Sequence, residues 1–237
     1  MSPELNILIL TAISIGFIHT LIGPDHYLPF IMMSKARGWS IGKTIWITLA
    51  CGIGHVFSSV VIGALGIGLG LAVGKLEAIE AVRGNLAAWA LITFGLVYAA
   101  WGLRRAFRNS PHTHTHLFGS LAGVTHKHSH DPEELHEHPE GQKANITPWV
   151  LFTVFVLGPC EPLIPILMYP ASQHDASGVI AVTAVFGLTT ISTMIAIVVV
   201  SSYGFKLLPL GKLDRFSHAI AGSTIALSGI AIKALGL

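Results

Sequence analysis

Charged side chains are scarce in this sequence. Only 11% of its 237 residues are Asp, Glu, Lys or Arg, whereas a soluble globular domain usually carries about 25%. Hydrophobic residues make up 52% of the chain, and its mean hydropathy is +0.67. So few charges exclude an ordinary water-soluble surface, and the composition predicts an integral membrane protein in contact with the lipid bilayer.

Cysteine and net charge are also low. The two cysteines, Cys51 and Cys160, both lie in apolar stretches, which argues against the disulfide framework of small secreted domains. The formal net charge of +2 indicates no nucleic-acid partner. A homo-oligomer is compatible with this composition.

Long apolar stretches recur along the chain. Each is long enough for a helix to cross a hydrocarbon core about 30 Å thick, and none alternates polar and apolar residues as a membrane β-strand would. The sequence therefore predicts an all-α membrane protein with six transmembrane helices. Their approximate bounds are Leu5 to Met33, Thr44 to Gly74, Leu86 to Leu103, Thr147 to Pro170, Gly178 to Ser202 and Phe216 to Leu237.

Basic residues predict the orientation, because cytoplasmic loops carry an excess of Lys and Arg. Eleven of the fourteen follow the first, third or fifth span, and three lie on the other side. We therefore expect a plasma (inner) membrane protein with both termini outside. The eleven are Lys35, Arg37, Lys43, Arg104, Arg105, Arg108, Lys127, Lys143, Lys206, Lys212 and Arg215.

A polar segment divides the six spans three and three. We predict a first three-helix repeat over 1–108, a His-rich cytoplasmic loop over 109–145 and a second repeat over 146–237. The run Gly23-Pro24-Asp25-His26 in the first span is echoed by Gly158-Pro159-Cys160-Glu161 in the fourth. Three spans reverse the chain direction, so the halves would form a 3+3 inverted-topology repeat, with helices 1 and 4 broken at these hinges.

Ionisable side chains inside the predicted spans are few and cluster by depth. Such groups cost roughly 2.5–3.5 kcal/mol or more at a helix centre, so each needs a reason. At about 1.5 Å per residue, His19 lies roughly 21 Å from Leu5 and His55 roughly 17 Å from Thr44. One midplane metal site would collect six side chains: His19, Asp25, His26, His55, Cys160 and Glu161.

Two interpretations of these residues stay open. Taken singly, His19 or His55 is more often an interhelical hydrogen-bonding group. Taken together, imidazole, carboxylate and thiol ligands suit a borderline divalent metal such as nickel, cobalt or zinc. The second interpretation predicts a transporter, not an enzyme, with the metal ion as substrate and no tightly bound cofactor. Alternating access would then operate around a midplane His/Asp site.

Eight of the thirteen histidines lie in the predicted cytoplasmic loop, where the pattern His-x-His-x-His occurs twice. Flexible tracts of this kind chelate metals without a packed core, and a solvated polar linker is the alternative. A chelating loop at the inner mouth favours export over import. The eight are His112, His114, His116, His126, His128, His130, His136 and His138.

The run from His19 to His26 resembles the UreH-like and NicO (nickel/cobalt efflux) proteins of the LysE-type transporter superfamily, as do the Gly-x-Gly-His of the second span and the His-rich loop. This resemblance implies nickel or cobalt as substrate. Nickel/cobalt permeases carry a related His-x4-Asp-His signature, whereas five residues separate His19 from Asp25 here. Their ligand geometry therefore cannot be transferred directly.

A second resemblance gives the alternative function. Gly158-Pro159-Cys160 is similar to the cysteine-bearing turns of CcdA and DsbD, which pass reducing equivalents between thiols across the membrane. Such a carrier needs paired cysteines that can form and exchange a disulfide. The first turn carries Asp25 here, so Cys51 would have to be the partner of Cys160.

Overall fold

The computed structural model describes residues 3–108, 112–115, 125–128, 146–207 and 211–235. Within these residues the membrane part of the chain is built from helices, as predicted. The elements, in chain order, are α1 (Pro3–Ile22), η1 (Pro24–His26), α2 (Leu28–Arg37), α3 (Ile41–Gly68), α4 (Val73–Arg108), β1 (His112–Thr115), β2 (Thr125–His128), α5 (Ile146–Leu157), α6 (Leu163–Ser172), α7 (Ala176–Leu207), η2 (Gly211–Phe216) and α8 (Ser217–Leu235).

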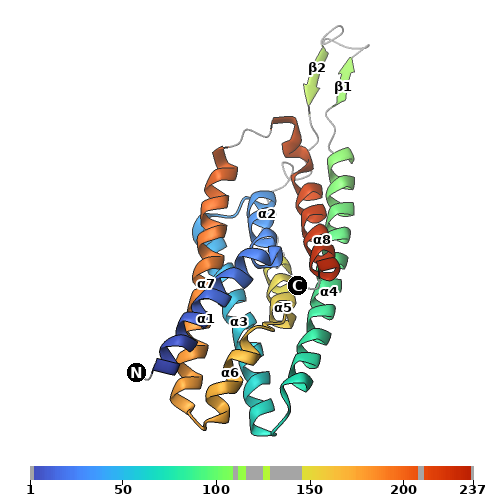
Figure 1. The fold of residues 1–237 in the computed structure, drawn as a ribbon. Helices are drawn as coiled ribbons and strands as arrows, with labels where there is room; N and C mark the ends of the chain where they lie inside the picture. The colour runs from blue at the N-terminus through green and yellow to red at the C-terminus, as the bar shows by residue number, and fades with distance from the viewer. Residues whose placement is uncertain (1–2, 109–111, 116–124, 129–145, 208–210, 236–237) are drawn as a thin grey trace, which may run out of the picture.

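Both predicted helix breaks are present. After α1, the Gly23-Pro24 pair leads into the short 3-10 helix η1, and α2 follows at Leu28. After α5, a turn over residues 158–162 precedes α6. A proline has no backbone N–H and restricts the residue before it, so an X-Pro pair interrupts a helix. In Figure 1 neither break lies at an end of the bundle.

Five described helices are long and apolar enough to cross a membrane: α1, α3, α4, α7 and α8. With 12 and 10 residues, α5 and α6 are each too short to cross alone. The predicted fourth span is therefore a pair of short helices. Each half of the chain holds a broken helix followed by two long ones, and the 3+3 inverted repeat remains a prediction.

Helix α4 differs most from the prediction. The third span was expected to begin at Leu86, but α4 begins at Val73 and contains Glu80 and Arg83. The predicted span was too short because the charge-poor window excluded this ion pair.

In the predicted loop, β1 and β2 pair antiparallel, with His112 opposite His128 and His114 opposite His126.

Among the described elements the most extensive contact is between α4 and α8, and these helices lie side by side along the bundle (Figure 1). Glycines on both helices permit a close approach. A Cβ at Gly222 would lie 2.6 Å from the Gly95 carbonyl oxygen, and a Cβ at Gly95 would lie 2.7 Å from the Gly222 carbonyl oxygen. Small residues at helix interfaces stabilise membrane bundles because association there depends on close packing.

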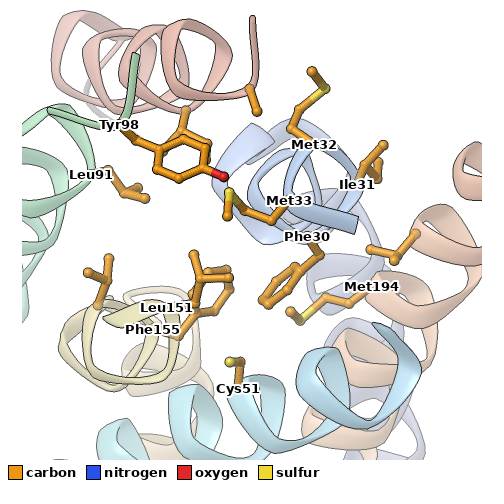
Figure 2. Close-up of a cluster of buried hydrophobic side chains, with 14 of the residues drawn as sticks. Phe30, Ile31, Met32, Met33, Cys51, Leu91, Tyr98, Leu151, Phe155 and Met194 are labelled. Atoms are coloured by element: carbon orange, nitrogen blue, oxygen red, sulfur yellow. The ribbon is translucent and has the colours of Figure 1, made fainter. Parts of the chain in front are cut away.

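A buried apolar cluster joins the two halves of the chain (Figure 2). Phe30 from α2 packs against Phe155 from α5 with the ring centroids 4.6 Å apart and the rings tilted by 52°, and Met194 from α7 belongs to the same cluster. Cys51 lies in this cluster and is 1% exposed, so it is a small buried apolar residue. The cluster thereby packs both broken helices against α3 and α7.

Replacing Gly222 with alanine is expected to destabilise the bundle. The added methyl group meets backbone atoms of α4 that cannot rotate away, and overpacking of this kind costs about 1–3 kcal/mol. Thermal unfolding of the detergent-solubilised protein measures the effect. Gly204→Ala in α7 is the matched control because nothing lies within 4 Å of its added Cβ. Equal melting temperatures for both variants would contradict the packing role of Gly222.

Candidate metal centre

Three of the six predicted ligands meet inside the bundle. His19 lies in the last turn of α1, His26 ends η1, and His55 lies in the middle of α3. The ring centroids are 4.7 Å apart for His19 and His26 and 5.1 Å apart for His26 and His55. One ligand atom from each residue lies within 4.8 Å of the others. Two nitrogens bound to one ion at about 2.1 Å are at most about 4.2 Å apart, so a small inward movement of the rings brings all three onto a single ion.

The three Nε2 atoms are buried and have no hydrogen-bond partner. His26 and His55 are 2% and 1% exposed. A buried polar nitrogen without a partner is costly, because it has lost its water without gaining another interaction. Three neighbouring histidines that each have such an atom call for an explanation, and metal ligation supplies one.

Hydrogen bonds fix two of the rings. Nδ1 of His26 lies 3.2 Å from the Gly23 carbonyl oxygen and 3.1 Å from Oδ1 of Asp25, and Nδ1 of His55 lies 3.3 Å from the Phe155 carbonyl oxygen. Carbonyl oxygens only accept, so each Nδ1 carries the hydrogen and donates it. Each Nε2 then presents a lone pair, as outer-sphere partners arrange for metal-binding histidines.

Glycine at each break leaves room for an imidazole ring. A Cβ at Gly23 would lie 2.5 Å from Nδ1 of His26, and a Cβ at Gly158 would lie 3.1 Å from Nδ1 of His55. The first distance is shorter than van der Waals contact allows, and the second is tight. The two Gly-Pro pairs therefore break the helices and also provide space for the rings.

A cavity of about 320 Å³ reaches the three-histidine centre. Its walls are largely aliphatic side chains of α1 and α4, such as Ile18 and Leu91, and its polar lining includes His19, His26, Asp25 and Glu161. The cavity therefore lies beside two of the three histidines, His19 and His26.

The other predicted ligands lie around this group, not in it. Asp25 accepts from His26, so it orients a ligand. Glu161 lines the cavity. Cys160 is completely buried in a separate apolar cluster. Among the residues that the structure describes, the only group of three or more His, Cys, Asp or Glu side chains with metal-ligand spacing is His19, His26 and His55.

The side chains of the loop histidines are not among those considered for this group. His116, His130, His136 and His138 lie outside the described residues, and the structure gives only the backbone of β1 and β2 for His112, His114, His126 and His128. Metal chelation by the loop stays a prediction.

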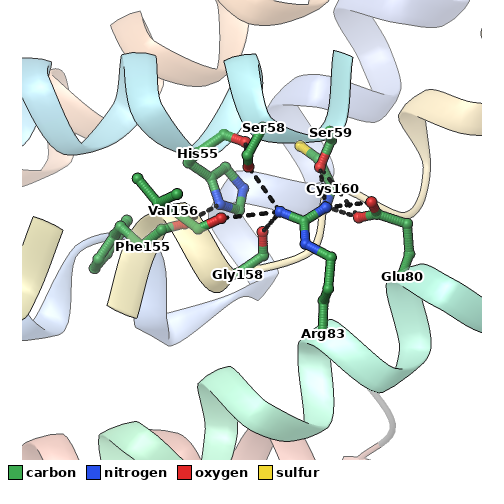
Figure 3. Close-up of polar contacts among 9 residues, drawn as sticks. All are labelled: His55, Ser58, Ser59, Glu80, Arg83, Phe155, Val156, Gly158 and Cys160. Atoms are coloured by element: carbon green, nitrogen blue, oxygen red, sulfur yellow. Dashed lines mark hydrogen bonds and ion pairs between the residues drawn. The ribbon is translucent and has the colours of Figure 1, made fainter. Parts of the chain in front are cut away.

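A buried ion pair that sequence reasoning missed lies next to the centre (Figure 3). Arg83 pairs with Glu80 and donates through Nη2 to the carbonyl oxygens of Val156, at 2.9 Å, and Gly158, at 3.1 Å. The Cys160 N–H donates to Oε2 of Glu80 at 3.0 Å. The available signal was the Glu-x-x-Arg spacing, which brings two opposite charges to one helix face.

Comparison with known families adds an independent finding. Residues 28–231 match the model of the family described as cytochrome C biogenesis protein transmembrane region. The chain belongs to this family. Comparisons with curated proteins and with solved structures gave no match. The matched range of the family model includes His55, Glu80, Arg83 and Cys160 but begins after His19 and His26.

Membership of the cytochrome c biogenesis family corrects the predicted function. The prediction of nickel or cobalt transport was wrong, because this family indicates a thiol–disulfide or cytochrome c biogenesis role. The match supports the resemblance to CcdA and DsbD, and nothing supports the resemblance to UreH-like and NicO proteins. The membrane location agrees with both the family and the apolar helices.

The two cysteines do not form the pair that such a carrier would use. Both are free and buried. The Cys160 N–H donates to Oγ of Ser59 at 3.1 Å, and Ser59 follows Cys51 by eight residues on α3, which is roughly 12 Å along the helix. A disulfide needs Cα atoms within about 7 Å. Joining Cys51 to Cys160 would therefore require α3 and the α5–α6 turn to move apart from their present contacts.

Proposed function

We propose that this member of the cytochrome c biogenesis family binds one transition-metal ion within the membrane, through Nε2 of His19, His26 and His55. The observation that carries the proposal is that three histidines meet in the interior and that the Nε2 atom of each is buried without a partner. Imidazole ligands suit copper, zinc and iron among the common biological metals. The proposal concerns binding, and it assigns no transport of nickel or cobalt.

Three protein ligands leave a coordination position open, which is typical of sites that exchange ligands and not of closed structural sites. The cavity beside His19 and His26 supplies the approach to that position. Asp25 and the Phe155 carbonyl keep two rings oriented when no metal is bound. The site is thus preorganised for the ion.

Charge balance favours a monovalent ion such as copper(I). The three imidazoles are neutral ligands, and among the residues that the structure describes Asp25 is the carboxylate in hydrogen-bond contact with one of them. Uncompensated charge is costly in an apolar interior. A copper(I) ion with ionised Asp25 gives a neutral centre, whereas zinc leaves one positive charge unless Glu161 at the cavity wall is also ionised.

Single substitution of His19, His26 or His55 is expected to weaken strongly the binding of one metal ion per chain. The background is a full chain in which the eight histidines between 112 and 138 are replaced by asparagine, so that the loop contributes no ligands. His26→Ala in this background loses one of three ligands, and its copper(I) affinity falls by more than the roughly 10–100-fold that loss of an outer-shell partner costs. Competition with a chromophoric chelator measures the affinity and the stoichiometry.

His174→Asn is the matched control for the histidine series. His174 is exposed, lies between α6 and α7 and has a φ of 53°, a conformation that asparagine adopts readily. The control keeps one bound ion per chain. Retention of that ion in each of the three histidine variants would refute the proposed centre. If the parent chain binds zinc in preference to copper, zinc is the ion of this centre.

The hinge glycines provide a graded test. Gly23→Ala should weaken metal binding more than Gly158→Ala, because the added methyl group meets the His26 ring at 2.5 Å but the His55 ring at 3.1 Å. Gly42→Ala in α3, with nothing within 4 Å of its added Cβ, should leave the affinity unchanged. The chelator competition compares all three. A reversed order would show that ring displacement does not control the affinity.

Thiol transfer is the second candidate, favoured by the family match. In this function the Cys160 thiolate attacks a disulfide of a partner protein, forms a mixed disulfide and releases one partner thiolate. The first thiol of a donor dithiol then attacks the Cys160 sulfur of the mixed disulfide, forms a disulfide with Cys160 and releases the second partner thiolate. The other donor thiol attacks this disulfide at the donor sulfur and releases the Cys160 thiolate. The two electrons thereby pass from the donor dithiol, which becomes a disulfide, to the partner disulfide, which becomes a dithiol. Cys160 is completely buried, so this reaction requires the α5–α6 turn to open.

Cys160→Ser separates the two candidates. Thiol transfer predicts that this variant loses every mixed disulfide trapped by acid quenching and alkylation in membranes, whereas Cys51→Ser keeps them. Metal binding predicts that Cys160→Ser binds copper(I) as tightly as the parent chain, because its thiol lies outside the three-histidine group. Trapped adducts on Cys160 together with no bound metal would establish the second candidate over the first.

A further inference from the structure

The Glu80–Arg83 ion pair is buried where an apolar environment makes charge expensive. Their side chains are 0% and 12% exposed, and both belong to α4, a helix apolar enough to span a membrane. Replacing such a pair with apolar residues is often neutral or stabilising, so a buried pair calls for a specific use. The contacts of the pair indicate that use.

Arg83 satisfies the carbonyl end of α5. The last carbonyls of a helix lack intrahelical partners and carry partial negative charge. Nη2 of Arg83 donates to the Val156 and Gly158 carbonyl oxygens and, at 2.7 Å, to Oγ of Ser58 on α3. One guanidinium thereby ties α3, α4 and the end of α5 together (Figure 3).

Glu80 satisfies the opposite side of the same break. Its Oε2 accepts from the N–H of Cys160 at 3.0 Å and from Oγ of Ser59 at 3.1 Å. A carboxylate is favourable beside the free N–H groups that precede a helix, as a cation is beside free carbonyls. The pair therefore places its positive member at the carbonyl end of α5 and its negative member before α6.

The break leads directly to the metal centre. The Phe155 carbonyl, adjacent to the Val156 peptide that Arg83 holds, accepts from Nδ1 of His55. Movement of the α5 end would release this bond, and the His55 ring would then be free to change tautomer or rotate. His19 and His26 have no such dependence, because they lie at the first break.

We propose that Arg83 and Glu80 are positioning residues for the three-histidine centre. By holding the end of α5, they keep the Phe155 carbonyl in place, and through it His55 presents Nε2 to His19 and His26. The inference deepens the proposed metal binding and rests on it for the affinity readout. The tautomer of His55 in the metal-free protein provides a readout that does not depend on metal.

The experiment compares Glu80→Gln, Arg83→Gln and Arg83→Lys with Glu77→Gln in the same loop-substituted background. Glu77 is exposed and lies one turn before Glu80 on α4, so its substitution removes a negative charge from the same helix but leaves the Glu80–Arg83 ion pair in place. Nitrogen NMR of histidine-labelled, metal-free protein reports which His55 nitrogen carries the hydrogen. Copper(I) affinity is measured in parallel by chelator competition.

The Arg83→Gln and Glu80→Gln variants are expected to lose the defined Nδ1–H state of His55 while His26 keeps its own. Copper(I) affinity is expected to fall about 10–100-fold, as for other outer-shell substitutions. Arg83→Lys keeps the charge but not the two-pronged geometry, and it is expected to fall between Arg83→Gln and Glu77→Gln. If Arg83→Gln does not fold, Arg83→Lys takes its place in both measurements.

An unchanged His55 tautomer and an unchanged affinity in a folded Arg83→Lys or Glu80→Gln variant would overturn the positioning role. The proposed function fails if the parent chain binds neither copper(I) nor zinc. If the His55 tautomer still changes in the Arg83 and Glu80 variants, the structural link between the ion pair and His55 stands without it. The two failures are therefore distinguishable.

Discussion

The backbone of two broken helices has to be satisfied inside an apolar bundle, and the rest of the site depends on this constraint. An interrupted helix frees carbonyl and N–H groups that lipid cannot hydrogen-bond. At the first break the Gly23 carbonyl accepts from His26. At the second, the Phe155 carbonyl accepts from His55, and the Val156 carbonyl accepts from Arg83. The polar side chains of the interior thus form hydrogen bonds with the freed backbone groups, in addition to the ligand role proposed for the histidines.

This constraint explains why the histidines are oriented before any ligand arrives. Each ring that caps a freed carbonyl donates through Nδ1, so its Nε2 faces the centre without a proton. A disulfide carrier of the same family would need cysteines at comparable turns. In this chain one break carries Asp25 and His26 and the other carries Cys160. The family indicates a role in thiol–disulfide exchange or cytochrome c biogenesis. The three histidines form a group of the kind that holds a metal ion.

Much of the arrangement was predictable because apolar stretches, Gly-Pro pairs and isolated histidines are local signals. The sequence predicted the helical membrane fold, both breaks and the meeting of His19, His26 and His55. It placed the start of the third span at Leu86 because a charge-poor window cannot contain Glu80 and Arg83. It also grouped Asp25, Cys160 and Glu161 with the ligands, because depth along a helix does not specify the direction in which a side chain points.

The sequence by itself determined which segments enter the membrane and where their helices break, since hydropathy and the missing N–H of proline act on residues close together in the chain. Only the tertiary structure decided which polar groups meet. His55 finds Phe155 one hundred residues away, and Arg83 reaches the end of α5 from α4. Such pairings depend on helix packing, to which glycines such as Gly95 and Gly222 contribute through backbone contact. No local pattern encodes that geometry.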